Sequence, residues 1–304
     1  MILFSHPKPF RPDTTPVQTQ AFRSWRKAFP KARILLFGTE EGTEAICRDL
    51  GLESAGPVRV EPKSGAALVS DIFRKVQPFR EPVSLFLNSD IILGEEAGAV
   101  VKLFSFAPGA WLASGRRRCL AAPCVDPATS WLANPRWGDV TELDYFLLKD
   151  FDCGMMPDFV IGHCAWDNWM IWNARQRGIG VADLSAGFAV YHLDHGYEYS
   201  RGNASAQKRA GPLEQRNLDL LGGEARRFHL GHATHILNGN GLQRRQGPGV
   251  WQRELEVFRL KNPRLEVWIR FLRHLFHPFI RAWEKNTRRR EDWNLGRRES
   301  PGAA

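Results

Sequence analysis

The 304-residue sequence lacks the features that mark small secreted proteins and integral membrane proteins. Its five cysteines are odd in number and scattered, and none of them forms a CxxC pair, which excludes a disulfide framework and a structural zinc site as the basis of the fold. No apolar run reaches the roughly 18 residues of a membrane-spanning helix. The first residues, MILFSHPKPF, lack the basic start and the apolar length of a signal peptide. We therefore expect a cytoplasmic protein that is not integral to a membrane.

Basic residues are concentrated at one end of the chain. The net charge is +9, and the last 54 residues hold 13 Lys and Arg against 7 Asp and Glu, so most of the excess lies there. The first 250 residues are nearly balanced and carry no basic stripe of the kind that binds nucleic acid. We expect no nucleic-acid partner.

Glycine-rich phosphate loops are also missing, because neither GxGxxG nor GxxxxGK[ST] follows the first apolar run. The first 110 residues instead alternate between short apolar runs and amphipathic stretches. The runs predict strands at 2–5, 33–37, 58–62 and 83–87, and the stretches predict helices at 14–29, 40–51 and 66–77. Thr15 is the expected N-cap of the first helix, and Gly51 is expected to end the second. This βαβα order predicts an α/β fold with a mostly parallel sheet flanked by helices.

A polar triplet interrupts the apolar segment VSLFLNSDII. Asn88, Ser89 and Asp90 follow a predicted buried strand, and open α/β sheets bind ligands where their strands end. A carboxylate at this position can hold Mg²⁺ or Mn²⁺, which in turn can bridge phosphate oxygens. A turn that caps the strand would explain the triplet equally well.

Two histidines close a later strand-like run, GFAVYH, whose last residue is His192. His192 and His195 are three residues apart, so both imidazoles can face one cation. Together with Asp90 they give a mixed nitrogen and oxygen ligand set that suits manganese. A shared polar hydrogen-bond network is the alternative.

A second acidic position lies at the start of a helical pattern that Gly178 closes. Asp167 lies at its start, where Asp167 or Asn168 can act as an N-cap. Trp166 and Trp169 flank the carboxylate, and aromatic faces beside a carboxylate suit sugar rings, although the two tryptophans can also be core residues.

The order of LNSD, DYF, IGHCAWDNW and HLDHGY over residues 1–237 resembles the GT-A glycosyltransferases, especially a bacterial group of uncharacterised transferase-like proteins. The segments GPLEQRNLDLLGG and HATHIL resemble the later part of that group. The resemblance implies a GT-A-like fold and a hexosyltransferase-like enzyme that needs a divalent cation, Mn²⁺ or Mg²⁺. The implied donor is a nucleoside-diphosphate sugar, in the first place a UDP-sugar, and the implied acceptor is a glycan or a lipid-linked molecule.

The family's functional positions can be transferred to this sequence residue by residue. Asp90 matches the last carboxylate of the DxD motif and would hold the metal, while Asn88 replaces the first carboxylate. HLDH is similar to the late ligand segment of galactosyltransferase-like enzymes, which gives His192 and His195 metal roles. AWDNW resembles the acceptor motif, so Asp167 becomes the base of an inverting reaction, with His163 as a second base or a diphosphate contact.

The remaining positions are implied contacts of the two substrates. The donor contacts are His6, Thr15, Asp71, Asn88 and Ser89. The acceptor contacts are Asp144, Trp166 and Trp169. Two other functions use the same residues: a metal-dependent hydrolase that activates water, and a catalytically degenerate module that binds nucleotide sugars.

We expect three parts: a glycosyltransferase domain over 1–240, a basic amphipathic helical extension over 250–292 and a disordered tail over 293–304. In PRLEVWIRFLRHLFHPFIRAWEK, aromatic and aliphatic residues recur at helical spacing between basic residues, and Pro278 should end or kink the helix. This stripe either packs on the domain or attaches the protein to an anionic inner membrane surface.

Overall fold

The computed structural model describes residues 1–79, 81–121, 136–194 and 211–265. The chain divides into two units, residues 1–243 and 244–304. No helix among the described residues is long and apolar enough to cross a membrane. The predicted amphipathic segment after residue 265 and the predicted tail lie outside the described residues.

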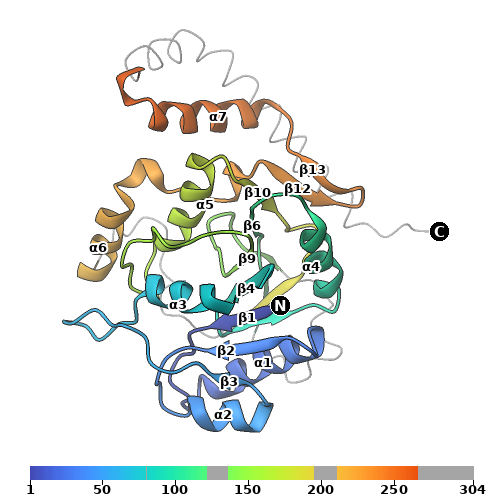
Figure 1. Ribbon diagram of the computed structural model, residues 1–304, viewed down its shortest axis with the longest axis vertical. Coiled ribbons are helices and arrows are strands. Elements are labelled where there is room, and N and C mark those ends of the chain that lie inside the picture. Colours follow the sequence, from blue (N-terminus) through green and yellow to red (C-terminus); the bar gives the residue numbers. More distant parts are fainter. Residues whose placement is uncertain (80, 122–135, 195–210, 266–304) are drawn as a thin grey trace. The chain divides into compact units, whose positions relative to one another are not determined.

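A nine-stranded sheet forms the centre of the first unit (Figure 1). Its spatial order is β13 (Gly241–Arg244), β12 (His235–Asn238), β10 (Gly180–Asp183), β6 (Trp111–Ser114), β9 (Tyr145–Lys149), β4 (Val83–Leu87), β1 (Ile2–Ser5), β2 (Arg33–Leu36) and β3 (Glu53–Ser54). On one side of β9, strands β4, β1 and β2 run parallel to one another, and on the other side β6 and β10 do. Strand β9 itself is antiparallel to both β4 and β6. The prediction of an α/β fold with a mostly parallel sheet is confirmed.

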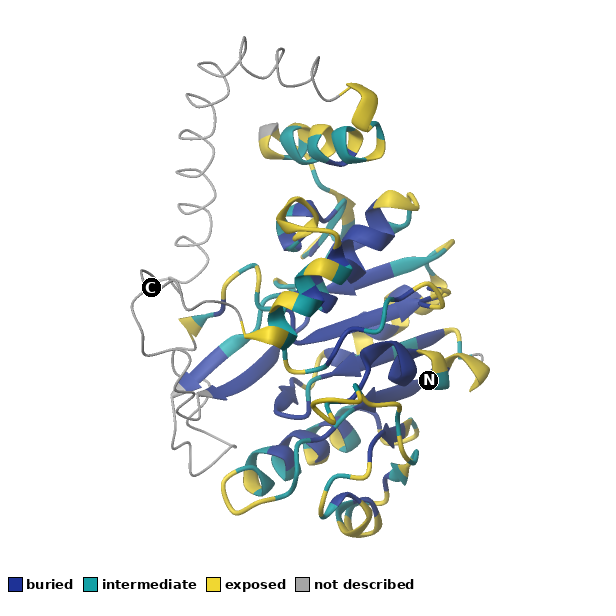
Figure 2. Cartoon of the chain, turned by 90° about the vertical axis from the view of Figure 1, so that its left-hand side faces the viewer, coloured by how far each residue is buried: buried dark blue, intermediate teal, exposed yellow. Residues whose placement is uncertain are grey.

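Helices cover both faces of this sheet, and the alternation of side chains along each strand decides which residues meet them. Leu3 and Leu85 face a core that includes Trp25, whereas Phe4 and Phe86 point to the opposite face and contact other aromatic rings. The strands are therefore buried on both sides, as Figure 2 shows in dark blue. The helices of the first unit are α1 (Thr15–Ala28), α2 (Thr43–Leu50), α3 (Val69–Val76), α4 (Ala97–Phe106), α5 (Trp166–Gln176) and α6 (Pro212–Leu221), with short 3₁₀ turns η1 (Gln77–Phe79), η2 (Glu224–Arg226) and η3 (Leu230–His232).

The described part of the second unit contains α7 (Pro248–Lys261) and the 3₁₀ turn η4 (Pro263–Leu265).

A smaller sheet contains β5 (Ile91–Leu93), β11 (Val190–Asp194), β7 (Arg118–Ala121) and β8 (Arg136–Trp137), in this order. Strand β11 is antiparallel to β5, and His192 pairs with Ile91. This register brings the late histidine segment beside the residues that follow β4.

Two sequence predictions about local structure are wrong. Residues 58–62 do not form the third strand: Val60 makes an isolated bridge to Ala67, and the strand that pairs with β2 is β3. The backbone N–H of Arg59 donates instead to the carboxylate of Asp71 at 2.8 Å, which ties this segment to α3. The N-cap of α1 is Thr14, and Thr15 is the first helical residue.

Gly51 ends α2 as predicted, and its backbone is left-handed with φ of 63°. A Cβ added here would meet no atom within 4 Å, so Gly51→Ala introduces backbone strain without a clash. We expect it to lower the free energy of unfolding by about 1 kcal/mol, measured by urea denaturation. Gly239→Ala is the matched control, because its Cβ is also unobstructed and its backbone is not left-handed. An equal loss in both variants would contradict the explanation by strain.

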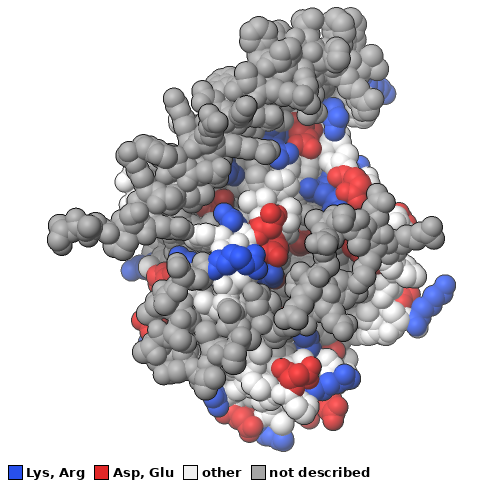
Figure 3. Space-filling model, turned by 180° about the vertical axis from the view of Figure 1, so that it is seen from behind, with Lys and Arg blue, Asp and Glu red and all other residues white. Residues whose placement is uncertain are grey.

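Charged side chains of both signs are interspersed on the face seen from behind, among the atoms that Figure 3 colours. Basic and acidic side chains also pair within the described structure, as Arg117 and Glu142 do, with Nη2 and Oε1 3.0 Å apart. The described part of this face is therefore of mixed charge.

Candidate functional site

Three segments from the centre of the large sheet end at one edge. The chain leaves β1 towards Lys8, it leaves β4 through Asn88 to Asp90, and Asp144 directly precedes β9. Because β9 is antiparallel to β4, its beginning lies at the same edge as the end of β4, and Leu87 pairs with Tyr145. This edge carries the polar side chains that the sequence singled out.

Asp90 and His192 lie side by side at this edge. Asp90 is 6% exposed, and its Oδ2 is 3.7 Å from Nε2 of His192, which is also buried. The Nζ of Lys8 donates a hydrogen bond to the same Oδ2 at 2.8 Å. The structure thus brings together two of the three predicted metal ligands, and the third, His195, lies outside the described residues.

A hydrogen-bonded group of charged residues surrounds Asp144. Its Oδ1 accepts a hydrogen bond from Nδ2 of Asn88 at 2.9 Å, and its Oδ2 accepts one from Nη1 of Arg117 at 2.9 Å. Arg117 also donates to Glu142 at 3.0 Å. Burial acts to lower the pKa of Arg117, but the two carboxylates outweigh it and hold this pKa above its ordinary value, so the guanidinium stays charged.

Asp167 lies in the first turn of α5, and its Oδ1 accepts a hydrogen bond from the backbone N–H of Asn168 at 2.8 Å. Burial raises the pKa of Asp167 to about 6, and the nearby charge of Asp144 acts in the same direction. The Asn168 N–H and Arg227 act in the opposite direction but do not cancel the increase. A carboxyl group with this pKa is ionised at neutral pH and is still basic enough to accept a proton.

The predicted N-cap role of this carboxyl group is wrong. The N-cap of α5 is Ala165, which has a positive φ of 87°, and neither Asp167 nor Asn168 holds that position.

His163 is half-buried in the loop before α5, and no hydrogen bond in the described structure joins it to Asp90 or Asp167.

On the β1–β2 side of the edge, His6 pairs with Glu40. The sequence predicted His6 as a site residue but not Glu40. The Nε2 of His6 is 3.1 Å from Oε1 of Glu40, and Thr15 is half-buried at the start of α1. Gly38 has φ of 116°, and a Cβ there would lie 1.9 Å from the Glu40 carboxylate, so glycine is required. Ser89 is buried, with 3% exposure, beside Asn88 and Asp90.

Three predicted substrate contacts are corrected by the structure. Asp71 is 1% exposed and is paired with Arg59, Arg74 and Lys75, so its carboxylate anchors α3.

The two tryptophans are core residues. Trp166 is 5% exposed and packs against the rings of Phe73, Phe86 and Phe146, with centroid distances of 6.2, 5.3 and 5.6 Å. Trp169 is 7% exposed and packs against Phe159. Neither ring is available to a sugar, so their assignment to the acceptor is wrong.

Sequence reasoning missed Lys8, Arg117 and Glu40 as members of the site. Each is a common charged residue in a polar stretch, and only the folded chain places it beside a predicted site residue. The one local signal was position, because Lys8 and Glu40 follow the first and second strands, at the edge where open α/β sheets generally bind ligands.

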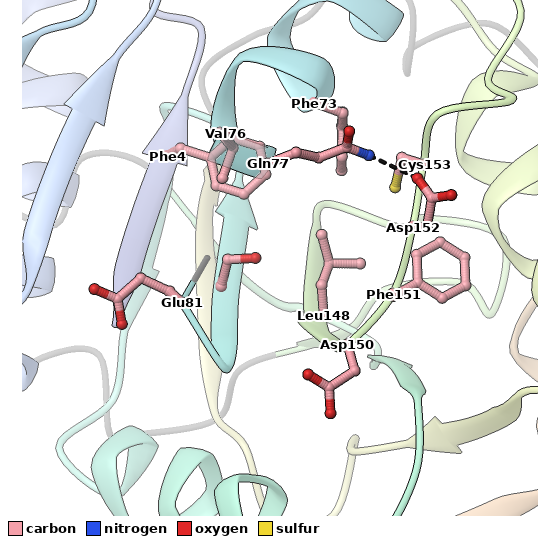
Figure 4. Close-up of a pocket in the computed structure, with 11 residues that line it drawn as sticks. Phe4, Phe73, Val76, Gln77, Glu81, Leu148, Asp150, Phe151, Asp152 and Cys153 are labelled. Carbon is pink, nitrogen blue, oxygen red and sulfur yellow. Dashed lines mark hydrogen bonds between the residues drawn. The ribbon is translucent and has the colours of Figure 1, made fainter. Parts of the chain in front are cut away.

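A separate cavity of about 550 Å³ lies at the other end of the central strands (Figure 4). Its wall includes Ser84 near the start of β4 and Asp150 just after β9, and Gln77 donates to Asp152 across it at 2.8 Å. Because it lies at the opposite edge from Asp90, it is not part of the candidate site.

No protein-family model matches the sequence, and a comparison with curated proteins gives no match. Solved structures with a similar chain path include a protein of Desulfovibrio desulfuricans G20 assigned to the nucleotide-diphospho-sugar transferases, with 12% identity, a TM-score of 0.41, and 72% of this chain and 95% of that chain covered. S. aureus TarS 1-349 in complex with UDP has 12% identity and a TM-score of 0.41, with 64% and 60% covered. Glucosyl-3-phosphoglycerate synthase of Mycobacterium tuberculosis in complex with Mg²⁺ and UDP has 10% identity and a TM-score of 0.40, with 73% and 79% covered.

Proposed function

We propose that this protein is a glycosyltransferase that moves a sugar from a nucleoside-diphosphate donor to an acceptor hydroxyl. One observation carries the proposal: a buried Asp90–His192 pair lies at the same edge of the sheet as Asp144, which accepts a hydrogen bond from Asn88 and whose charge adds to the raised pKa of Asp167. Transfer at an anomeric carbon needs one group that stabilises the departing diphosphate and another that accepts the proton of the incoming hydroxyl. The Asp90–His192 pair would serve the first function and Asp167 the second.

The chemistry of the donor set fits a divalent cation. Asp90 Oδ2 and His192 Nε2 offer one oxygen and one nitrogen at a buried position, and Mg²⁺ or Mn²⁺ commonly takes few protein ligands and fills its other positions with water and phosphate oxygens. In the described part of the chain no group of three His, Cys, Asp or Glu residues forms a complete metal site, and His195 is the proposed additional ligand. The bound ion would supply positive charge next to the diphosphate.

The chain's own residues account for the remaining steps. Asp167 accepts the proton from the acceptor hydroxyl as the acceptor oxygen bonds to the anomeric carbon and the bond from that carbon to the diphosphate oxygen breaks. A single displacement of this kind inverts the anomeric centre. Asp144, held by Asn88 and Arg117, faces the acceptor, and its charge adds to the effect of burial, which is the main cause of the raised pKa of Asp167.

Several finer assignments belong to the same proposal. The donor nucleotide, in the first place a UDP-sugar, occupies the side of His6, Thr15 and Ser89, and His163 contacts the diphosphate. The acceptor is a glycan or a lipid-linked molecule, and the basic segment after Pro263 would bring the enzyme to an anionic membrane surface.

A donor screen tests the proposal. Thermal unfolding should be measured with UDP-, GDP- and ADP-sugars, each with Mn²⁺ and with EDTA. One class of donor should raise the melting temperature by several degrees in Mn²⁺, because a ligand that binds only the folded state stabilises it. The shift should disappear in EDTA. Stabilisation by no nucleotide sugar, together with metal-dependent cleavage of simple esters, would support a hydrolase and contradict the proposal.

A further inference from the structure

Lys8 occupies a position that the proposed cation also needs. Its Nζ lies 2.8 Å from Asp90 Oδ2, the same oxygen that faces His192 Nε2 at 3.7 Å. A lysine ammonium group and a divalent ion that share one carboxylate oxygen would repel each other strongly at such distances.

The fold holds the backbone of Lys8 in place. Gln18 of α1 is 1% exposed, and its side-chain amide makes two hydrogen bonds to Lys8: Oε1 accepts from the Lys8 N–H at 2.8 Å, and Nε2 donates to the Lys8 carbonyl at 3.0 Å. Because both the oxygen and the nitrogen of this buried amide bond to the Lys8 backbone, they fix the position from which the lysine side chain extends. The contact between Lys8 and Asp90 is therefore supported by the helix behind it.

The lysine side chain is far more exposed to solvent than the carboxylate that it contacts. It is 42% exposed, whereas the side chain of Asp90 is 8% exposed. A lysine carries its charge on a flexible stem of four carbons, so the ammonium group can leave Asp90 without any change of the backbone.

We propose that the Lys8 ammonium group is a built-in competitor of the divalent cation at Asp90, and that it turns to the diphosphate oxygens when nucleotide and cation bind together. This inference rests on the proposed function for its second half only. Without nucleotide, Lys8 neutralises Asp90 and keeps affinity for the cation low. With nucleotide, the diphosphate supplies enough negative charge for both cations. Binding of metal and binding of nucleotide are thereby coupled, and such coupling is reciprocal.

The test measures Mn²⁺ binding directly, by electron paramagnetic resonance of free Mn²⁺, with the full chain and no sugar donor. Lys8→Met should bind Mn²⁺ alone about fivefold or more tighter than the wild type, the lower end of usual coupling between two sites. Saturating UDP should remove this advantage, because the wild-type lysine then contacts the diphosphate. Asp90→Asn should bind Mn²⁺ more weakly than either protein.

Lys27→Met is the matched control. Lys27 is also paired with a carboxylate, Glu95 at 2.7 Å, but both side chains are highly exposed, so this variant removes the same net charge away from the site. It should bind Mn²⁺ like the wild type. Circular dichroism should show that all variants are folded.

The proposal is overturned if Lys8→Met binds Mn²⁺ alone no tighter than the wild type, or if Asp90→Asn binds it equally well. Failure of the transferase proposal looks different. In that case no nucleotide sugar stabilises the protein, yet the gain of Mn²⁺ affinity in Lys8→Met without nucleotide would still be measured.

Discussion

Replacing Asp90 with asparagine should lower the rate of sugar transfer by about 10³-fold or more, because the proposed site would lose the charged oxygen that holds the cation beside the diphosphate. Asparagine keeps the size of the side chain, so packing at this buried position is preserved. Initial rates of nucleoside-diphosphate release, measured with the donor found in the screen, give the effect. Raising the Mn²⁺ concentration should not restore the rate, since the ligand itself is absent.

The fold should tolerate this change. The ion-pair partner of Asp90, Lys8, is partly exposed, and an exposed lysine that loses its partner is hydrated by water. We expect the free energy of unfolding to change by about 1 kcal/mol or less.

Asp150→Asn is the matched control, because Asp150 also pairs with a lysine, Lys149, but lies at the opposite edge of the sheet. It should keep wild-type activity. Full activity in Asp90→Asn, or an equal loss in both variants, would contradict the metal role of Asp90.

Local sequence patterns predicted the part of the fold that depends on local order. Alternating apolar runs and amphipathic stretches gave β1, α1, β2, α2, α3 and β4, and Gly51 was placed correctly as the end of α2. The position of β9 between β4 and β6 could not be predicted, because an apolar run such as YFLLK does not contain the direction or the neighbours of its strand. The true β3 was missed since it is only two residues long.

The candidate site shows the same division. Asn88 and Asp90 could be found because polar residues directly after a buried strand are a local signal, and the pairing of β11 with β5 then brought His192 to them. Trp166 carried a misleading signal: beside Asp167 it looks like a sugar-binding ring, yet α5 turns it into the aromatic core under Phe86. Neighbours in sequence can point to opposite sides of a helix. Lys8 and Arg117 needed the tertiary structure, since nothing in their own segments indicates Asp90 or Asp144 as partners.

Asp167→Asn should lower kcat by about 10²- to 10⁴-fold, the usual contribution of a general base. Donor binding should be unchanged, since the proposed cation and nucleotide contacts lie on other elements. The pH profile gives a sharper result than the rate alone. In the wild type, kcat/KM should fall as the pH falls through about 6, the raised pKa of Asp167, because only the ionised form accepts a proton. The residual kcat/KM of the variant should not show this fall near pH 6.

The same pKa predicts a change in stability with a defined sign. The folded-state pKa of about 6 lies above the ordinary 3.8, so the stability that protonated Asp167 contributes is fully present below pH 3.8 and is lost as the pH rises through 6. Asp167→Asn removes this loss, so the melting temperature of the variant should rise relative to that of the wild type as the pH is raised from 4 to 7.

Asp158 is the opposite case, because Ser70 and Arg59 outweigh burial and lower its pKa. Asp158→Asn should therefore become less stable relative to the wild type as the pH rises from acid values. If Asp167→Asn changes neither kcat nor stability, the carboxylate is not the base. If the variant is slower but more stable, the ionised carboxylate at this position lowers stability and is needed for catalysis.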